Sequence, residues 1–183
     1  MGRHNLDSWD NRLKLGAGVE LDGRVDTDAG NVYGLTLGRQ RHDGQVRYEL
    51  EYQRGSFDVQ RLQAGVLTQA VSGSGKYQAL TLNAYRQQAW NESWSGYAGL
   101  GLGWGRAELP SACVPGCVAG AASKSGLALL ARAGAEYRLD AHQNLFAQYT
   151  LLRVQGPASG STPGVSYDKQ WIGALAVGYR YVF

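Results

Sequence analysis

Apolar and polar residues alternate one by one along most of this chain, in about eight segments separated by polar or glycine-rich connections. Alternation with a period of two is typical of a β-strand with one apolar and one polar face, and no segment shows a helical period. The pattern predicts an antiparallel all-β fold with strands within Leu13–Leu21, Tyr33–Gly38, Val46–Gln53, Leu80–Tyr85, Trp94–Gly105, Leu127–Arg138, Leu145–Leu151 and Trp171–Phe183.

The connections between the predicted strands are alternately long and short. The short ones are Arg41–Gly44, Gln87–Glu92 and Asp140–Gln143. The long ones are Asp22–Gly30, Arg54–Gly75, Ala107–Ser123 and Gln155–Asp168. Transmembrane barrels show this asymmetry, with tight turns at the periplasmic end and longer loops at the external end. An even number of strands then places both termini on the periplasmic side.

The spacing of aromatic residues separates a membrane barrel from a soluble one. Trp94 and Trp104 lie ten residues apart on one face, as do Trp171 and Tyr181. Ten residues at ~3.3 Å each, tilted by ~40°, rise about 25 Å, the height of the apolar band between two aromatic girdles. In a soluble lipocalin-like barrel the apolar face would point inward around a ligand. The spacing favours an apolar face toward lipid and a polar face toward the lumen.

The composition agrees with a membrane location. The chain has 183 residues, of which 11 are tyrosine, 5 tryptophan and only 3 phenylalanine, and 18% are charged, against roughly 25% in soluble domains. Tyr and Trp favour membrane interfaces because their rings are apolar and their tips are polar. The formal net charge of +3 is scattered along the chain, which argues against nucleic-acid binding.

We therefore predict an eight-stranded antiparallel up-and-down transmembrane β-barrel. Residues 1–10 would form an N-terminal tail, and residues 11–183 a single barrel domain. The first five residues lack the apolar stretch of a signal peptide, so an exported protein would already have lost it.

The end of the chain resembles the terminal strand of bacterial outer-membrane proteins. Tyr179, Tyr181 and Phe183 place aromatic rings at alternate positions up to the last residue. The plan of the whole chain is similar to the small OmpA/OmpX-like and opacity-type barrels. The resemblance implies a bacterial outer-membrane location with periplasmic termini. It also implies recognition of the last strand by the barrel-assembly machinery, and we expect a monomer.

Charged residues on the predicted lumenal face form the best-defined polar cluster. Side chains fill the interior of an eight-stranded barrel, and an unpaired buried ion costs several kcal/mol. We therefore expect ion pairs there, above all between Glu51 and Arg132, which match in face and depth. The predicted network consists of Lys14, Glu49, Glu51, Arg132, Glu136, Arg138 and Arg180. It can be a structural plug or the polar track of a very narrow pore.

Two further groups of residues fall at the predicted external end. Cys113 and Cys117 flank a Pro-Gly turn, and such a pair in an exported protein is usually a disulfide. Basic residues recur near the external rim, where they could bind lipopolysaccharide phosphates or simply remain solvated. These are Arg24, Arg54, Arg61, Lys76, Arg106, Lys124, Arg153 and Lys169.

No constellation predicts catalysis, a metal or a cofactor. Gly99, Gly101, Gly103 and Gly105 share one strand face rather than a strand-to-helix loop, so they predict room for large lumenal side chains and not a phosphate site. His42 and His142 fall in predicted periplasmic turns and His4 in the tail, far from outer-leaflet ester bonds. The cysteine loop has no further His or Cys ligand for a metal.

The sequence thus predicts a non-enzymatic outer-membrane barrel. Its external loops would bind an extracellular ligand or stabilise the lipopolysaccharide layer. A narrow channel for small solutes is the alternative.

Overall fold

The computed structural model describes most of the chain, in ten stretches. These are residues 2–5, 8–16, 19–27, 30–41, 44–64, 67–109, 112–114, 117–119, 122–158 and 164–182. Side chains are described for residues 2–3, 30–41, 44–59, 73–109, 122–158 and 166–182. In the described part of the chain, no helix is long and apolar enough to cross a bilayer.

Eight antiparallel strands form a closed ring of hydrogen-bonded neighbours, which confirms the predicted barrel. In ring order these are β1 (Gly2–Asn5), β4 (Gly30–Gln40), β5 (Val46–Ala64), β6 (Leu67–Ala89), β7 (Trp94–Leu109), β10 (Ala122–Arg138), β11 (Gln143–Val154) and β13 (Gln170–Tyr181). Neighbours from β4 to β13 follow one another along the chain, apart from the short strands inserted between them. The barrel is therefore an up-and-down meander.

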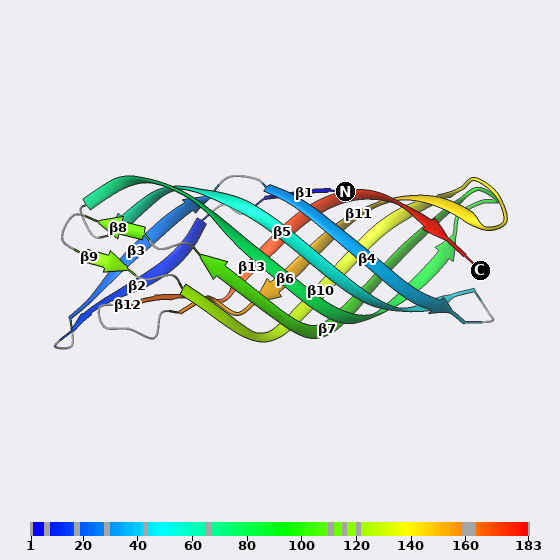
Figure 1. Cartoon of the computed structure of the whole chain (residues 1–183). Helices are drawn as coiled ribbons and strands as arrows, with labels where there is room; N and C mark the ends of the chain where they lie inside the picture. Colours follow the sequence, from blue (N-terminus) through cyan, green and yellow to red (C-terminus); the bar gives the residue numbers. More distant parts are fainter. Residues whose placement is uncertain are drawn as a thin grey trace.

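The two ends of the barrel differ (Figure 1). At the turn end lie the short connections after Gln40, Ala89 and Arg138, where the short turns were predicted, and the C-terminus lies beside them. At the loop end lie five further strands: β2 (Ser8–Gly16), β3 (Val19–Thr27), β8 (Ala112–Val114), β9 (Cys117–Ala119) and β12 (Gly164–Tyr167). There β12, β2 and β3 extend the barrel sheet from the edge of β5, while β8 and β9 form a separate hairpin.

The first strand of the ring differs from the prediction. The short β1, within the predicted tail, pairs with both β13 and β4. The predicted first strand, Leu13–Leu21, is divided between β2 and β3, which form a hairpin with Leu13 opposite Leu21. Gly16 ends β2, and Val19 begins β3. The alternating residues of this segment thus belong to two strands rather than one.

Strands β5 and β6 are much longer than the alternation predicted. They pair from Val46–Arg86 at the turn end to Ala64–Leu67 at the loop end, with a register shift between Val59 and Arg61, so the described part of the predicted loop Arg54–Gly75 is a two-stranded ribbon. The alternation continues into this ribbon with its sense inverted. Ser56 and Asp58 are exposed, whereas Phe57 and Val59 are buried. The predicted strand ended at Gln53 because apolar residues face outward before this point and inward after it.

The ring is closed by β1 only toward the loop end. Gly30–Val32 of β4 pair with β1, but no described strand pairs with Tyr33–Gln40 on the side of β4 that faces β13. Gly34, Thr36 and Gly38 occupy lumenal positions of β4 and are nevertheless exposed, unlike the buried lumenal positions of β5.

Candidate functional site

The outer face of the barrel is an apolar band bounded by aromatic girdles. Outward residues such as Leu35 and Leu100 are 78% and 71% exposed. Trp94 packs against Tyr137 at the turn end, with ring centroids 5.1 Å apart, while Trp104 and Trp171 are exposed toward the loop end. So many exposed large apolar side chains in one band would be untenable in water. A lipid bilayer is the environment that fits them.

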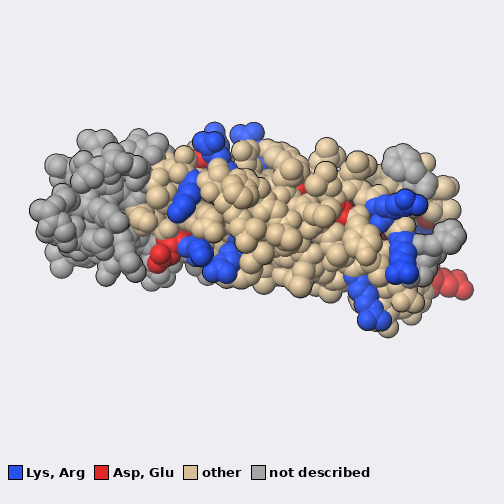
Figure 2. Space-filling view, turned by 90° about the horizontal axis from the view of Figure 1, so that it is seen from below, with Lys and Arg blue, Asp and Glu red and all other residues tan. Residues whose placement is uncertain are grey.

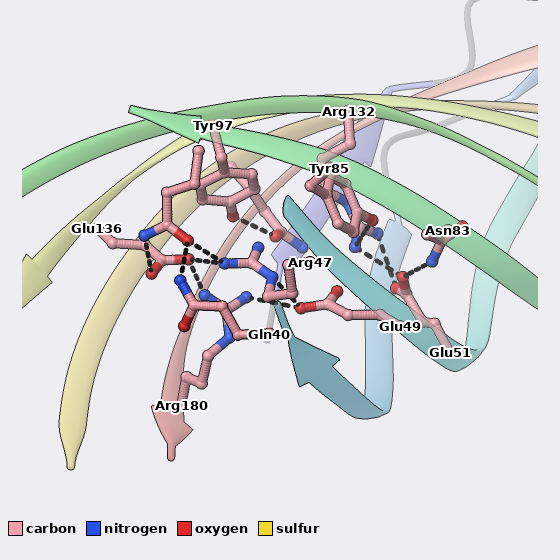
Figure 3. A network of polar contacts seen from close by, with 12 residues as sticks. Gln40, Arg47, Glu49, Glu51, Asn83, Tyr85, Tyr97, Arg132, Glu136 and Arg180 are labelled. Atoms are coloured by element: carbon pink, nitrogen blue, oxygen red, sulfur yellow. Dashed lines mark hydrogen bonds and ion pairs between the residues drawn. The ribbon is translucent and has the colours of Figure 1, made fainter. Parts of the chain in front are cut away.

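The first lumenal ion cluster is centred on Arg132 of β10 (Figure 3). Its Nη1 and Nη2 donate to Oε2 and Oε1 of Glu51 at 2.6 and 2.7 Å, a bidentate pair. Its Nε donates to Thr150 at 2.7 Å, and Asn83 donates to Glu51 at 3.0 Å. Tyr85 accepts a further bond from Nη1 at 3.0 Å. Both charges are almost completely buried, and their hydrogen bonds offset much of the cost of removing them from water.

A second ion cluster lies closer to the turn end. Arg47 contacts Glu49 at 2.6 Å through Nε and Glu136 at 2.9 Å through Nη1. Arg180 of β13 contacts the same two carboxylates. The Arg47 guanidinium also lies 4.7 Å from the centre of the Tyr97 ring. Charges from three strands, β5, β10 and β13, thus meet in one group that crosses the lumen, and Tyr97 of β7 lies against it.

These clusters contain five of the predicted lumenal charges. The structure brings together Glu49, Glu51, Arg132, Glu136 and Arg180. Arg138 is not part of the network, because β10 ends there and the side chain is exposed at the turn end. Lys14 lies outside the residues whose side chains are described.

Sequence reasoning missed several members of the network. Arg47 shares the face of Glu49 and Glu51, and this parity was the signal that could have found it. Neutral partners such as Asn83 and Thr150 gave no signal, because a polar residue on a lumenal face is ordinary. The glycines of β7 leave the expected room. A Cβ at Gly99 would meet the Tyr85 ring at 2.5 Å.

Toward the loop end the lumen is filled by apolar side chains, which corrects the expectation of a polar lumen throughout. The side chains of Phe57, Leu152, Val154 and Ile172 are each no more than 1% exposed. Tyr77, equally buried, lies among them at the border with the polar half, where the amide of Gln53 donates to its hydroxyl at 3.4 Å. Apolar packing of this density leaves little room for a hydrated path.

A belt of polar and basic residues follows the outer girdle on every long strand. Arg54 comes two residues after Tyr52, Arg106 two after Trp104, and Arg153 two after Leu151, all facing outward. Gln78 pairs with Arg54 on one side and Arg106 on the other, and Lys76 is the next outward residue. Figure 2 shows two zones of basic side chains, separated by a band that is mostly uncharged on that face.

The six described members of the predicted basic set all lie at the loop end of this band. Arg54, Lys76, Arg106, Lys124 and Lys169 are exposed. Arg153 is half-buried and lies 5.7 Å from the centre of the Trp171 ring. Arg106 contacts Glu108 at 2.7 Å, but both side chains are about half exposed, so this pair contributes little. The side chains of Arg24 and Arg61 lie outside the described set.

Solved structures with this architecture are known. No family model and no curated protein matches the sequence. Neisserial surface protein A is similar over 100% of this chain and 96% of its own, with a TM-score of 0.54 and 16% identity. The fold is that of a small eight-stranded outer-membrane barrel. A structure of Ail, the attachment invasion locus protein of Yersinia pestis, in complex with the heparin analogue sucrose octasulfate covers 100% of this chain and 99% of its own, at a TM-score of 0.46 and 18% identity.

The cysteines of this outer-membrane-type barrel lie on β8 and β9. Cys113 pairs with Val118, and Val114 pairs with Cys117, so the two cysteines are one residue out of register. Their side chains lie outside the described set, and the disulfide remains a prediction.

The histidines and terminal aromatics lie in several places. His142 lies at the turn end, where its Nδ1 is 2.9 Å from the carbonyl oxygen of Val182. His4 lies in β1, and His42 falls outside the described residues. Tyr179 and Tyr181 are exposed on β13, whereas Phe183 is outside the described residues. Among described residues, no three His, Cys, Asp or Glu converge as a metal site would require.

Proposed function

We propose that this protein is a non-enzymatic barrel of the bacterial outer membrane, with the turn end in the periplasm and the loop end outside the cell. The apolar outer band and the fold support the membrane location. The short connections at the turn end agree with the orientation. We further propose that the belt binds phosphate groups of lipopolysaccharide and so stabilises the outer leaflet around the barrel.

The belt is the observation that carries this proposal. Arg54, Lys76 and Arg106 lie on three adjacent strands, immediately past the outer girdle. A cation at that height meets the phosphates of the headgroup layer, and Arg forms bidentate bonds with phosphate. The ion pair of Arg106 with Glu108 is solvent-exposed and therefore weak, so phosphate can replace the carboxylate.

Binding is tested by the stability of the folded barrel in vesicles with and without lipopolysaccharide. Intact lipopolysaccharide should raise the unfolding temperature of the wild type, and dephosphorylated lipopolysaccharide should raise it less. The variant Arg54→Gln/Lys76→Gln/Arg106→Gln should lose the phosphate-dependent part. The matched control is Arg39→Gln/Arg86→Gln/Arg138→Gln, which removes three exposed cations of the turn end and should retain it. Equal shifts in both triple variants would contradict the proposal.

A channel is the second candidate function, and the packing of the lumen counts against it. Two ion clusters and the apolar side chains beyond them fill the interior at successive depths. In planar bilayers we expect no stable unitary currents. Reproducible single-channel steps would favour the channel. Recognition of Tyr179, Tyr181 and Phe183 by the barrel-assembly machinery, binding of an extracellular ligand at the loop end, and a monomeric state remain predictions.

A further inference from the structure

The apolar outer face is hollowed where β7, β10 and β11 lie side by side (Figure 1). The hollow has a volume of about 440 Å³. Its floor consists of the outward residues Ala98 of β7 and Ala131 and Ala133 of β10. Ala98 pairs with Ala133, so two methyl side chains lie next to each other in a band of mostly large side chains. Small residues at outward positions thus leave a depression in the surface that faces lipid.

Larger apolar side chains form the walls of this hollow. Leu100 of β7 borders it on one side, and Tyr149 and Leu151 of β11 border it on the other. Tyr149 pairs with Ala133, while Ala131 pairs with Leu151 and with Leu100. Each alanine of β10 therefore lies beside a large side chain. A trough with a floor of methyl groups and apolar walls fits a hydrocarbon chain, which buries apolar surface in it.

A cation lies directly beside the hollow. Arg86 of β6 pairs with Ala98, and its side chain is exposed on the same outward face as Leu82. In the part of the chain whose side chains are described, its guanidinium group has no ion-pair partner. Strand β6 ends three residues further on, at Ala89, so Arg86 lies near the turn end of the apolar band. From there a long side chain extends its charge to the headgroups and keeps its methylene groups in hydrocarbon.

The position of this cation decides from which leaflet a ligand comes. The anions that border the hydrocarbon are the phosphates of the lipid headgroups, and Arg binds phosphate well. Arg86 is the lateral neighbour of Ala98, whereas Arg106 of the belt lies eight residues further along β7. Eight residues at ~3.3 Å each, tilted by ~40°, rise about 20 Å. A lipid whose phosphate contacts Arg86 therefore belongs to the leaflet of the turn end.

We propose that Arg86 and the hollow together bind one anionic glycerophospholipid of the leaflet at the turn end. The phosphate contacts the guanidinium group, and an acyl chain occupies the hollow. The inference rests on the proposed membrane location and orientation. It does not depend on the belt, which lies at the other end of the band and is proposed to bind lipopolysaccharide. The two ends of the barrel then bind different lipids.

The surroundings of Arg86 favour an anionic headgroup over a zwitterionic one. Val46 of β5 is its neighbour on the side away from the hollow, and Gln88 is the next outward residue toward the turn end. Neither side chain offers a carboxylate to the ammonium group of a zwitterionic lipid. Gln88 pairs with Gly96, over which the ring of Trp90 lies. The amide group and the indole N–H are both hydrogen-bond donors, which suit phosphate oxygens.

Binding is measured by native mass spectrometry of the full chain, released from detergent micelles that contain dioleoylphosphatidylglycerol or dioleoylphosphatidylcholine. The wild type should retain one phosphatidylglycerol molecule and release phosphatidylcholine. Arg86→Gln should bind phosphatidylglycerol about tenfold more weakly, because it loses a charge-assisted hydrogen bond. Ala133→Leu should also weaken the binding, because the larger side chain fills the floor of the hollow and leaves the cation in place.

Three matched controls should retain the lipid. Ala147→Leu enlarges an outward alanine of β11 that does not line the hollow, and Arg138→Gln removes another exposed cation of the turn end. The belt variant Arg54→Gln/Lys76→Gln/Arg106→Gln tests the opposite end of the band. Loss of phosphatidylglycerol in any of these controls, at the level of Arg86→Gln, would overturn the proposal. Equal retention of both lipids by the wild type, or a lipid-free dimer, would overturn it as well.

Photo-crosslinking in cells tests the leaflet. With p-benzoylphenylalanine in place of Leu100, we expect an adduct with phospholipid whose yield falls in the Arg86→Gln background. The same probe at Leu82, which faces lipid outside the hollow, should give adducts that do not depend on Arg86. An adduct of the Leu100 probe with lipopolysaccharide would contradict the assigned leaflet. The absence of lipid adducts at both positions would contradict the membrane location itself, and so separates failure of the proposed function from failure of the phospholipid site.

Discussion

The two halves of the lumen are built by opposite rules. In the half toward the turn end, the interior is charged and the outer face is apolar. In the half toward the loop end, Phe57, Leu152 and Ile172 fill the interior, and the outer face carries polar residues such as Arg106. The first half is built like a membrane protein and the second like a soluble barrel. The height at which alternation changes its sense therefore marks the bilayer boundary as clearly as the girdles do.

The comparison predicts that the stability of the charged half depends on the pairing of its buried ions. Removing the side chain in Arg132→Ala leaves Glu51 buried without its cation, which should cost about 3–5 kcal/mol of the free energy of unfolding. Reversible denaturant unfolding in lipid vesicles measures this loss. The double variant Arg132→Met/Glu51→Leu removes both charges and should recover most of it. A loss below about 1 kcal/mol in the single variant would mean that water reaches Glu51.

The stability of the apolar half should depend instead on how closely its side chains pack. Leu152→Ala opens a cavity among buried side chains and should cost about 3 kcal/mol. Its neighbour Leu151 on the same strand faces lipid, which fills the space left by Leu151→Ala, so this control should cost less. The same unfolding measurement compares the two. Equal losses would show that the loop half is not packed as a core.

A substitution that disturbs the close packing beside the ion pairs should reduce the free energy of unfolding by a smaller amount. A Cβ at Gly101 would collide with the amide oxygen Oδ1 of Asn83, and the Nδ2 group of the same side chain donates a hydrogen bond to Glu51. Gly101→Ala should therefore cost about 1–3 kcal/mol. Gly34→Ala is the control, because its Cβ would lie 3.4 Å from Oε1 of Glu51, an ordinary contact. If both variants unfold at the same denaturant concentration, β7 has room that the structure does not show.

A last prediction concerns the stability of the barrel at alkaline pH, and it expects no change at neutral pH. Burial raises the pKa of Tyr167 at the loop end to about 12, above the ordinary value of 10.0. The folded state therefore favours the neutral phenol, and stability is unaffected below pH 10 but falls as pH rises toward 12. Tyr167→Phe should lose less stability over that range. Identical pH profiles for the variant and the wild type would contradict burial of this hydroxyl.

The sequence predicted the strands of the membrane band and their short turns, because period-two alternation and turn residues are local signals. It did not predict the length of β5 and β6, whose alternation inverts after Gln53. It also assigned Leu13–Leu21 to one strand, because alternation does not distinguish a continuous strand from two consecutive strands that both alternate. For the lumenal network, the sequence indicated on which face of its strand each charged residue lies and at what depth in the barrel. The pairing of Arg47 with Glu136 also depends on the offset between neighbouring strands, which is a property of the closed ring.

The ion pairs of the lumen join residues far apart in the chain, with 81 positions separating Arg132 from Glu51 and 89 separating Arg47 from Glu136. Apart from the contact of Arg47 with Glu49 within β5, a single hairpin of this barrel therefore lacks the partners of its own charges. If it entered the bilayer alone, it would bring bare ions into hydrocarbon, at a cost of several kcal/mol for each. Such charges raise the free energy of inserting one hairpin at a time, relative to inserting all strands together. We therefore expect the network to favour concerted insertion of the strands, in addition to bracing the finished barrel.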